Sequence, residues 1–333
     1  SMKKIPVIID CDPGHDDMMA LVLAIGSPTL EVKLVTTVAG NKPLEMVTRN
    51  CLNVMHYIGA DDIPIAVGCD SPLVRPQNHV DPLLAEMRRN TGAISEGAHG
   101  KSGLDGFTFP EDNPKKPEEI RAVEYMAKIL KESEEPVTLI PTGPLTNVAL
   151  LLKCYPDLKP KIKKISMMGG TCKFVFTRKY MEFNTFVDPE ATKIVFESGL
   201  PIDMYGYDVT YSVLYDKEAI ERMRRNGNQS SLMVADLLDT FMYRHNHAFR
   251  WLGLTDVCPI HDACAVAGVI DPDLVTEAAY MHVDIQTDGK LFDGATVCDY
   301  EDILGGEKNV RVIFNMNTPG FIDLLVRSGA ACK

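Results

Sequence analysis

Four aspartates crowd one short segment near the start of the chain. Residues 8–17 read Ile-Ile-Asp-Cys-Asp-Pro-Gly-His-Asp-Asp, so an apolar run ends at Asp10 and three further carboxylates follow at Asp12, Asp16 and Asp17. One aspartate can cap a helix that starts here, because the first backbone N–H groups of a helix lack partners. Capping leaves the repulsion among the other carboxylates unrelieved. Carboxylate oxygens without a histidine or cysteine cluster favour a hard cation such as Ca²⁺ or Mg²⁺ over zinc.

The segments around this motif alternate between strand and helix patterns. Runs rich in valine and isoleucine predict strands at 5–10, 31–38, 137–141, 163–168 and 202–206. Amphipathic periodicity predicts helices at 15–26, 44–59, 118–132, 145–154 and 188–198. This order is typical of an α/β fold with a largely parallel sheet and helices on both faces. Ligands in such folds gather beyond the carboxyl ends of the strands, where the aspartates are expected.

The C-terminal third adds a different pattern. Helices are predicted at 231–250, 261–269 and 319–329, and a strand at 309–315. Segments 276–286 and 289–299 are predicted to form an antiparallel pair joined near Asp288 and Gly289. The predicted fold class is therefore α/β, with an open, mostly parallel central sheet, helices on both faces and a small antiparallel pair near the C-terminus.

The composition excludes several classes of function. The chain has 333 residues, is 45% hydrophobic, and carries 34 Lys and Arg against 46 Asp and Glu, a formal net charge of −12. The apolar fraction does not fit a disordered chain, and the acidic balance argues against nucleic-acid polymers or anionic membranes as partners. Nine cysteines without a Cys-x-x-Cys pair predict free thiols in a reducing cytoplasm. Small molecules and metal cations are the expected partners.

Several motifs together resemble one enzyme family. The run at 10–17 looks like the N-terminal signature of the nucleoside hydrolases, the calcium-dependent N-ribohydrolases. Other pieces follow in that family's order: Val-Ala-Gly-Asn at 38–41, His-Gly at 99–100, Pro-Thr-Gly-Pro-Leu-Thr-Asn at 141–147, Met-Met-Gly-Gly at 167–170, Glu-Phe-Asn at 182–184, Val-Asp-Pro-Glu-Ala at 187–191, His-Asp at 261–262, and Gly-Lys-Leu at 289–291. The resemblance covers essentially the whole chain. It implies one nucleoside hydrolase-like domain over 1–333, because a single pocket needs residues from both ends.

The resemblance also implies roles for individual residues. Ca²⁺ would be held by Asp12, Asp17, the backbone carbonyl of Thr142, and Asp262, with the ribose 2′- and 3′-hydroxyls and a water completing the shell. Asp12 would take a proton from the Ca²⁺-bound water, which then attacks C1′ of a ribonucleoside and releases ribose and free base. Ribose contacts are expected from Asp16, Asn41, Met168, Glu182 and Asn184. Carboxylates near the sugar would stabilise an oxocarbenium-like transition state.

Fewer residues are expected at the base. His261 directly precedes Asp262 and matches the family's leaving-group histidine, and an imidazole pKa near 6.5 suits that task. His99 is expected to line the base side of the pocket. Regions 70–116 and 225–258 are expected to set base selectivity, the first of them as a lid. A set of aromatic side chains either reaches the nucleobase or forms the core and rim of its own helix. The set consists of Tyr243, His245, His247, Phe249 and Trp251. A structural role, with no part in the chemistry, is expected for the remaining histidines: His15, His56, His79 and His282.

The sequence departs from the family pattern on the 5′ side of the ribose. Relatives carry an asparagine for the 5′-hydroxyl six residues before the glutamate of the Glu-Phe-Asn motif, and this chain has Phe176 there. The surrounding segment 173–179 is aromatic and basic, and Lys101 replaces the usual glutamate after the loop histidine. One hypothesis is that the pocket accepts a modified or 5′-phosphorylated nucleoside, with lysine or arginine meeting the anion. The alternative is a solvated basic loop.

Two other classes of function are considered. A Mg²⁺-dependent phosphatase could use Asp10 or Asp12 as nucleophile, since an apolar strand that ends in Asp-x-Asp is also typical of those enzymes. That alternative leaves the Glu-Phe-Asn and His-Asp motifs unexplained. The chain could instead be a noncatalytic nucleoside-binding protein that retains the fold. The resemblance further implies a homodimer or homotetramer, while the sequence leaves the preferred base undecided.

Overall fold

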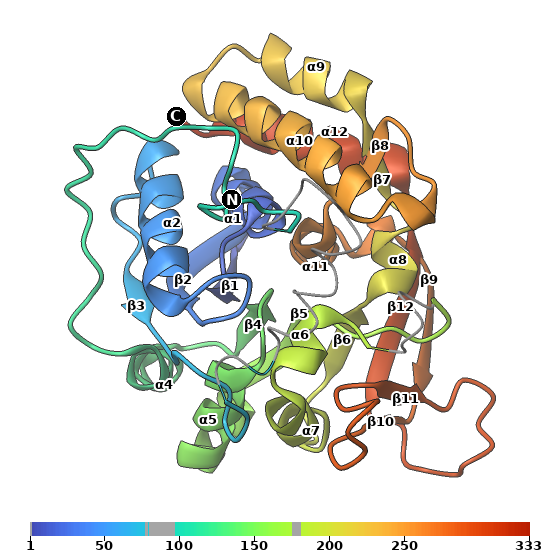
Figure 1. Ribbon diagram of the computed structural model, residues 1–333. Helices are drawn as coiled ribbons and strands as arrows, with labels where there is room; N and C mark the ends of the chain where they lie inside the picture. Colours follow the sequence, from blue (N-terminus) through green and yellow to red (C-terminus); the bar gives the residue numbers. More distant parts are fainter. Residues whose placement is uncertain (1, 77–78, 80–96, 175–180) are drawn as a thin grey trace.

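An eight-stranded sheet forms the centre of the protein (Figure 1). The computed structural model describes residues 2–76, 79, 97–174 and 181–333. The strands lie in the order β3-β2-β1-β4-β5-β6-β12-β9. Their bounds are β1 Ile5–Cys11, β2 Leu30–Thr37, β3 Ile65–Val67, β4 Val137–Pro141, β5 Ile162–Met168, β6 Ile202–Tyr205, β9 Val275–Met281 and β12 Val310–Met316. All described neighbours pair in parallel except β9, which runs antiparallel to β12 at one edge.

Strand β1 shows why its sequence is apolar almost throughout. Val7, Ile9 and Cys11 belong to the hydrophobic cluster on one face of the sheet, and Ile8 belongs to the cluster on the other face. Side chains alternate between the two faces of a strand, so a strand covered on both sides buries every position. The continuous apolar run before Asp10 therefore reflects a central position in the sheet.

Helices cover both faces. The first face carries α1 His15–Gly26, α2 Leu44–Tyr57, α9 Lys217–Arg225, α10 Gln229–Ala248, α11 His261–Ile270 and α12 Thr318–Ala331. The second face carries α4 Ala122–Glu132, α5 Thr146–Cys154 and α7 Pro189–Phe196. Figure 1 shows α9, α10 and α12 on one side of the sheet and α4, α5 and α7 on the other. This arrangement confirms the predicted fold class, with predicted helix 118–132 beginning later, at Ala122.

Short elements complete the described structure. They are α6 Phe183–Val187, α8 Tyr207–Thr210, β7 Leu214–Asp216, β8 Val257–Pro259, β10 Val283–Ile285, β11 Thr296–Cys298 and the 3₁₀ turns Pro156–Lys161, Arg250–Leu252 and Pro272–Leu274. The antiparallel pair near the C-terminus exists, but the predicted pairing of 276–286 with 289–299 is wrong in extent. Strand β9 joins the main sheet beside β12, and only β10 and β11 pair with each other. Alternation alone does not say which partner a strand chooses.

The order in which successive strands are added to the sheet changes direction at β1. It builds β2 and β3 on one side of β1 and then returns to place β4 on the other side. In open α/β sheets a crevice opens at such a switch point, beyond the carboxyl ends of the strands. Here those ends are Cys11 and Pro141, so the residues that follow them, from Asp12 and from Thr142, face this crevice. None of the described helices is both long and apolar enough to cross a membrane.

Candidate active site

Asp17 closes the turn between β1 and α1. Its Oδ1 accepts hydrogen bonds from the Asp12 backbone N–H at 3.1 Å and the Thr142 hydroxyl at 2.8 Å. Its Oδ2 accepts from the Gly14 backbone N–H at 3.4 Å, at the N-terminus of α1. Asp17 is therefore the capping carboxylate of the four, and it also joins the ends of β1 and β4. The helix N-terminus favours its negative charge.

Asp12 is fully buried and held on one side only. Its Oδ2 accepts from the Asn41 backbone N–H at 2.8 Å, and the Asn41 side chain donates to the Asp12 carbonyl at 3.0 Å. Among the described residues its Oδ1 has no hydrogen-bond partner. A Cβ added to Gly143 would lie 2.8 Å from this oxygen, so the close approach of the backbone requires glycine there. Asp12 thus keeps one carboxylate oxygen available for water or a cation.

Asp10 serves the sheet. Its Oδ1 accepts from the Thr36 hydroxyl at 2.6 Å and from the Asn147 amide at 2.7 Å. Burial raises the pKa of Asp10 to about 7. Its hydrogen-bond partners come from β2 and α5, so the carboxylate links these elements to β1. The contacts of Oδ1 give Asp10 a structural task, which weakens its candidacy as a nucleophile, while its buried Oδ2 has no hydrogen-bond partner among the described residues.

Three buried carboxylates meet where α1 approaches α11. Ligand oxygens of Asp16, Asp17 and Asp262 all lie within 4.8 Å of one another. Burial, together with repulsion from the neighbouring aspartates, raises the pKa of both Asp16 and Asp262. The sequence assigned the metal to Asp12, Asp17, Thr142 and Asp262, whereas this closest group includes Asp16, which was assigned to ribose. The predicted ligands and ribose contact therefore occupy one continuous acidic cluster.

The donor set fits a hard cation. The Asp12 Oδ1 and Asp16 Oδ1 atoms are buried without a hydrogen bond among the described residues, although the His99 Nε2 atom lies 3.6 Å from the latter. A buried polar atom without a partner is costly, and buried charges need a partner or a metal. A cation would satisfy both oxygens and reduce the repulsion. The group consists of oxygen donors, as Ca²⁺ and Mg²⁺ prefer.

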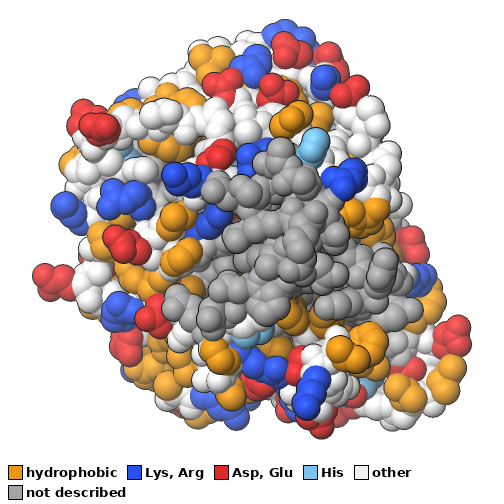
Figure 2. Space-filling view, viewed as in Figure 1, with side chains coloured by type: hydrophobic (Ala, Val, Ile, Leu, Met, Phe, Trp, Pro, Cys, Tyr) orange, Lys and Arg blue, Asp and Glu red, His pale blue; other side chains and the backbone are white. Residues whose placement is uncertain are grey.

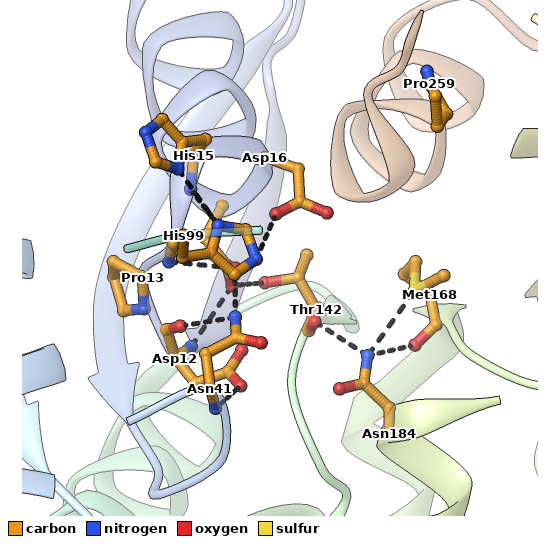
Figure 3. Close-up of polar contacts among 12 residues, drawn as sticks. Asp12, Pro13, His15, Asp16, Asn41, His99, Thr142, Met168, Asn184 and Pro259 are labelled. Atoms are coloured by element: carbon orange, nitrogen blue, oxygen red, sulfur yellow. Dashed lines mark hydrogen bonds and ion pairs between the residues drawn. The ribbon is translucent and has the colours of Figure 1, made fainter. Parts of the chain in front are cut away.

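Asn184 ties β4 to β5 beneath this cluster. Its side-chain amide donates to the Thr142 carbonyl and the Met168 carbonyl, each at 3.0 Å, and lies 3.4 Å from the Met168 sulfur (Figure 3). The Thr142 carbonyl is thus already a hydrogen-bond acceptor. Because a carbonyl oxygen has two lone pairs, it can also face a cation. Figure 3 shows Thr142 between Asp12 and Asn184.

Glu182 caps the short helix α6. Its carboxylate accepts from the backbone N–H groups of Asn184 at 2.8 Å, Gly170 at 3.1 Å and Thr185 at 3.2 Å. Burial raises the pKa of Glu182 to about 7, against the opposing effect of these hydrogen bonds. The cap fixes the start of α6 and hence the position of Asn184. This structural task accompanies the predicted contact with ribose.

The raised pKa of Glu182 predicts a pH dependence of stability. A carboxyl group with a higher pKa in the folded chain stabilises the fold most below its unfolded value of 4.5, and this contribution is lost as the pH rises to about 7. The loss is on the order of 3 kcal/mol. We expect chelator-treated protein to lose less unfolding free energy between pH 5 and pH 8 in Glu182→Gln than in the wild type. Denaturant titrations measure this, with the exposed Glu124→Gln as control; equal losses in wild type and Glu182→Gln would contradict it.

His99 reaches the cluster from a loop that follows an undescribed segment. Its Nδ1 lies 3.0 Å from His15 Nδ1 and accepts from the His15 backbone N–H at 3.1 Å. The two imidazoles and Phe241 stack with centroids 5.2–5.3 Å apart. His15 Nε2 lies 2.8 Å from the Asp105 carbonyl. His15 thus has a structural task, because its buried ring holds the His99 loop (Figure 3).

His261 lies at the start of α11, next to Asp262. Its Nδ1 is 2.7 Å from the Thr210 hydroxyl. Its ring meets Tyr211 edge-on at 5.1 Å and Tyr207 at 5.5 Å between centroids. Burial lowers the pKa of His261 to about 3. The imidazole is thus a neutral group in an aromatic wall, rather than a solvated acid of ordinary pKa.

The aromatic set at the C-terminal end of α10 and in the turn that follows divides into two groups. His245 is buried, its Nε2 lies 3.0 Å from the Tyr211 hydroxyl, and Phe249 packs against its ring at 5.0 Å. Tyr243 is 67% exposed and Trp251 is 46% exposed. His245 therefore supports Tyr211, which contacts His261, and Phe249 packs against His245, whereas Tyr243 and Trp251 lie on the surface. The His247 ring packs against the Tyr243 ring, with 5.8 Å between the ring centroids.

Most of the basic segment near the 5′ side lies outside the described residues, including Phe176, Arg178 and Lys179. The described Lys173 stacks its ammonium over the Tyr300 ring at 3.8 Å and the Phe314 ring at 4.6 Å. Part of the predicted lid, 77–78 and 80–96, is also outside the described residues. On the described part of the face in Figure 2, acidic, basic and apolar side chains are intermixed.

Sequence reasoning missed the residues that follow β6. Tyr207, Thr210 and Tyr211 surround His261, yet they belong to no motif that was singled out. Their signal was positional, because residues just beyond the carboxyl end of every parallel strand face the same edge of the sheet. The strand at 202–206 was predicted, so the residues after it were candidates.

Comparison with known proteins agrees with this geometry. The family described as inosine-uridine preferring nucleoside hydrolase matches residues 7–323. The pyrimidine-specific ribonucleoside hydrolase of Citrobacter koseri is 43% identical over 321 residues, which cover 96% of each chain. The same-named protein of Salmonella agona is 43% identical over 322 residues, covering 96% of this chain and 97% of its own.

Solved structures share the architecture along the whole chain. A purine-preferring ribonucleoside hydrolase from Gardnerella vaginalis superposes with a TM-score of 0.85 at 28% identity, and 98% of each chain is covered. A plant nucleoside hydrolase gives a TM-score of 0.85 at 27% identity, with coverage of 98% of this chain and 99% of that one. The structural similarity therefore covers the N-terminal segment with Asp12 as well as the C-terminal segment with Asp262.

Proposed function

The chain belongs to the inosine-uridine preferring nucleoside hydrolase family and hydrolyses the N-glycosidic bond of ribonucleosides, and we propose that it does so on pyrimidine ribonucleosides with bound Ca²⁺. The observation that carries the proposal is the buried acidic cluster at the switch point, where the Asp12 Oδ1 atom has no described hydrogen-bond partner. His261 directly precedes Asp262, a member of this cluster, in the chain.

The acidic cluster would hold the cation and the sugar together. Asp12, Asp17, Asp262 and the Thr142 carbonyl are the proposed ligands, and their oxygen atoms suit Ca²⁺. When bound, the cation supplies Lewis acidity that makes a coordinated water easier to deprotonate and orients the ribose hydroxyls. We assign the ribose contacts to Asp16, Asn41, Met168, Glu182 and Asn184. Hydrogen bonds near the cluster support this assignment: the Asn41 amide donates to Asp17, and the Asn184 amide donates to the carbonyls of Thr142 and Met168.

Asp12 is the proposed general base. Its pKa is raised by burial and by the charge of Asp17, and its Oδ2 is fixed by the Asn41 N–H. The remaining oxygen can accept a proton from a water that attacks C1′ of the ribose. The carboxylates around the sugar stabilise the positive charge that develops as the glycosidic bond breaks. Asp12 therefore acts at the water, while Asp16 acts at the sugar.

His261 is the proposed group at the leaving base, and His99 lines the same side of the pocket. The aromatic wall of Tyr207 and Tyr211 holds the His261 ring in place. A neutral imidazole in a buried site can donate a hydrogen bond to the base as negative charge develops on it. Preorganised donors of this kind act most strongly where water is excluded.

Similarity supports pyrimidine bases. Two relatives at 43% identity are named pyrimidine-specific, whereas the solved purine-preferring enzyme is 28% identical. No observation favours the three alternatives, which were 5′-phosphorylated or modified substrates, a phosphatase, and a noncatalytic binder. The free state of all nine cysteines supports the cytoplasm as location. One domain and a homodimer or homotetramer remain predictions.

A substrate panel tests this function. Uridine, cytidine, inosine and the corresponding 5′-monophosphates are incubated with wild-type protein in Ca²⁺, and released ribose and phosphate are measured separately. We expect uridine and cytidine to have a kcat/KM at least about tenfold above inosine, a difference of roughly 1.4 kcal/mol in transition-state binding. The 5′-monophosphates should react more slowly than the nucleosides.

Each alternative gives a different product pattern. Faster cleavage of the 5′-monophosphates would support the phosphorylated substrate, and release of phosphate without ribose would indicate a phosphatase. Binding of uridine without either product would indicate the noncatalytic protein. Inosine as the best substrate would overturn the pyrimidine assignment but would leave the reaction unchanged.

A further inference from the structure

The hydroxyl of Thr210 contacts Nδ1 of His261, a residue that the proposed function places at the leaving base. We propose that Thr210 is a positioning residue that holds His261 in the Nε2–H tautomer, so that the ring donates a hydrogen bond to the departing base. The inference rests on the proposed function for the role of His261. Thr210 is the last residue of α8, which follows the carboxyl end of β6, and its side chain is fully buried.

The hydroxyl proton of Thr210 has one available acceptor among the described residues. Among the described residues, the only hydrogen-bond partner of this hydroxyl is His261 Nδ1, at 2.7 Å. A buried hydroxyl proton without an acceptor costs free energy, so native structures avoid it. The proton therefore points at Nδ1, and Nδ1 must be a lone-pair acceptor.

The contact with Thr210 determines which ring nitrogen of His261 carries the proton. A neutral histidine carries one N–H, and the other ring nitrogen accepts. With Nδ1 as acceptor, the proton is on Nε2. In the described part of the chain, Nε2 of His261 makes no hydrogen bond to the protein. Nε2 is also not one of the fully buried atoms without a partner, so it is accessible to a ligand. Nε2–H is thus the donor that the ring presents to a ligand.

The neighbouring tyrosines fix the orientation of the His261 ring. Tyr207 and Tyr211 contact the His261 ring at 5.5 and 5.1 Å between centroids, and both residues flank Thr210 on the same short segment. Rotation of the imidazole would break the Thr210 contact and displace these rings. One segment, 207–211, therefore sets both the plane and the tautomer of His261.

The tautomer matters for the reaction. When the C1′–N bond breaks, the base keeps the electron pair, C1′ gains OH from water, and the remaining proton of that water ends on the base. An Nε2–H donor stabilises the developing negative charge on the base, whereas the opposite tautomer would present a lone pair to it. Thr210 acts through His261 and needs no contact with substrate.

The test replaces Thr210 with an isostere and with a conservative residue. Thr210→Val keeps the shape and removes the hydroxyl, and Thr210→Ser keeps the hydroxyl. Thr192→Val is the matched control, because Thr192 is an equally buried threonine whose hydroxyl donates to the Asp188 carbonyl at 2.9 Å in α7. Each variant is assayed on uridine and on p-nitrophenyl β-D-ribofuranoside, whose leaving group departs without a hydrogen-bond donor.

We expect Thr210→Val to lower kcat for uridine about 10- to 100-fold, part of the roughly 10²–10⁴ that a positioned proton donor contributes. Its KM for uridine and its kcat for the nitrophenyl riboside should stay within about threefold, because binding and the water side are intact. Thr210→Ser should recover most of the uridine rate. Equal losses on both substrates would show a merely structural role and overturn the inference.

A second readout does not depend on activity. In ¹⁵N-labelled wild-type protein, the His261 resonances, assigned by their loss in His261→Gln, should show a protonated Nε2 and an unprotonated Nδ1. A protonated Nδ1 would overturn the inference. If wild-type protein hydrolyses neither substrate, the proposed function fails, while this spectrum still decides the tautomer.

Discussion

Replacing Asp12 with asparagine is expected to lower kcat for uridine by about 10²–10⁴, the usual contribution of a general base. Asparagine keeps the shape and can still accept the Asn41 N–H through its carbonyl oxygen, which is the contact that Asp12 Oδ2 makes at 2.8 Å. It cannot take a proton from water. The loss should appear in kcat more than in KM, measured as ribose released at saturating Ca²⁺.

The Asp12→Asn result needs a control for folding and for charge. Asp323→Asn removes an exposed carboxylate that pairs with Arg222 at 2.8 Å, far from the crevice in the fold, and should leave the rate unchanged. Thermal unfolding should show that Asp12→Asn is folded. An Asp12→Asn enzyme that retains more than about a tenth of the wild-type kcat would exclude Asp12 as the base.

The second large effect is expected at Asp262. Asp262→Asn should weaken Ca²⁺ binding by about two to three and a half orders of magnitude, since the loss of one partner from a buried charge cluster costs roughly 3–5 kcal/mol. The same change should stabilise the metal-free protein. Burial and the charges of Asp16 and Asp17 raise the pKa of Asp262, so a neutral side chain there removes repulsion that no cation relieves. Calorimetric titration measures the affinity, and unfolding in chelator measures the stability.

The opposite directions of these two effects make the prediction specific. An ordinary destabilising mutation would lower both Ca²⁺ affinity and metal-free stability. Asp236→Asn is a suitable control, because Asp236 pairs with Arg224 at 2.7 Å on the surface and such pairs contribute little. Unchanged Ca²⁺ affinity in Asp262→Asn would remove Asp262 from the proposed ligands.

The fold could be predicted from the sequence to a large extent because its central strands are buried on both faces. The apolar run before Asp10 and the helical period after His15 correspond to β1 and α1 within one residue. The sequence pattern failed for the shortest strand and for one strand pairing. Strand β3 has three residues and was not predicted, whereas β9 lies within the predicted strand 276–286 but pairs with β12.

The candidate site was predictable where a local motif carries the chemistry. Asp12, Asp16 and Asp17 lie on one turn, and the structure brings Thr142 and Asp262 to them from β4 and α11. The parts that escaped prediction depend on contacts between distant segments. The His15–His99 contact spans 84 residues, and the Thr210–His261 contact spans 51. No local pattern encodes such pairs, because they arise from the order of the strands.

The most direct test of the central claim is a Ca²⁺ titration of chelator-treated wild-type protein, with bound Ca²⁺ and ribose release from uridine followed in the same samples. We expect ribose release to rise in proportion to bound Ca²⁺ and to reach its plateau at one ion per chain. Full-rate ribose release in chelator, before any Ca²⁺ is bound, would contradict the proposal that the acidic cluster works as a cation site.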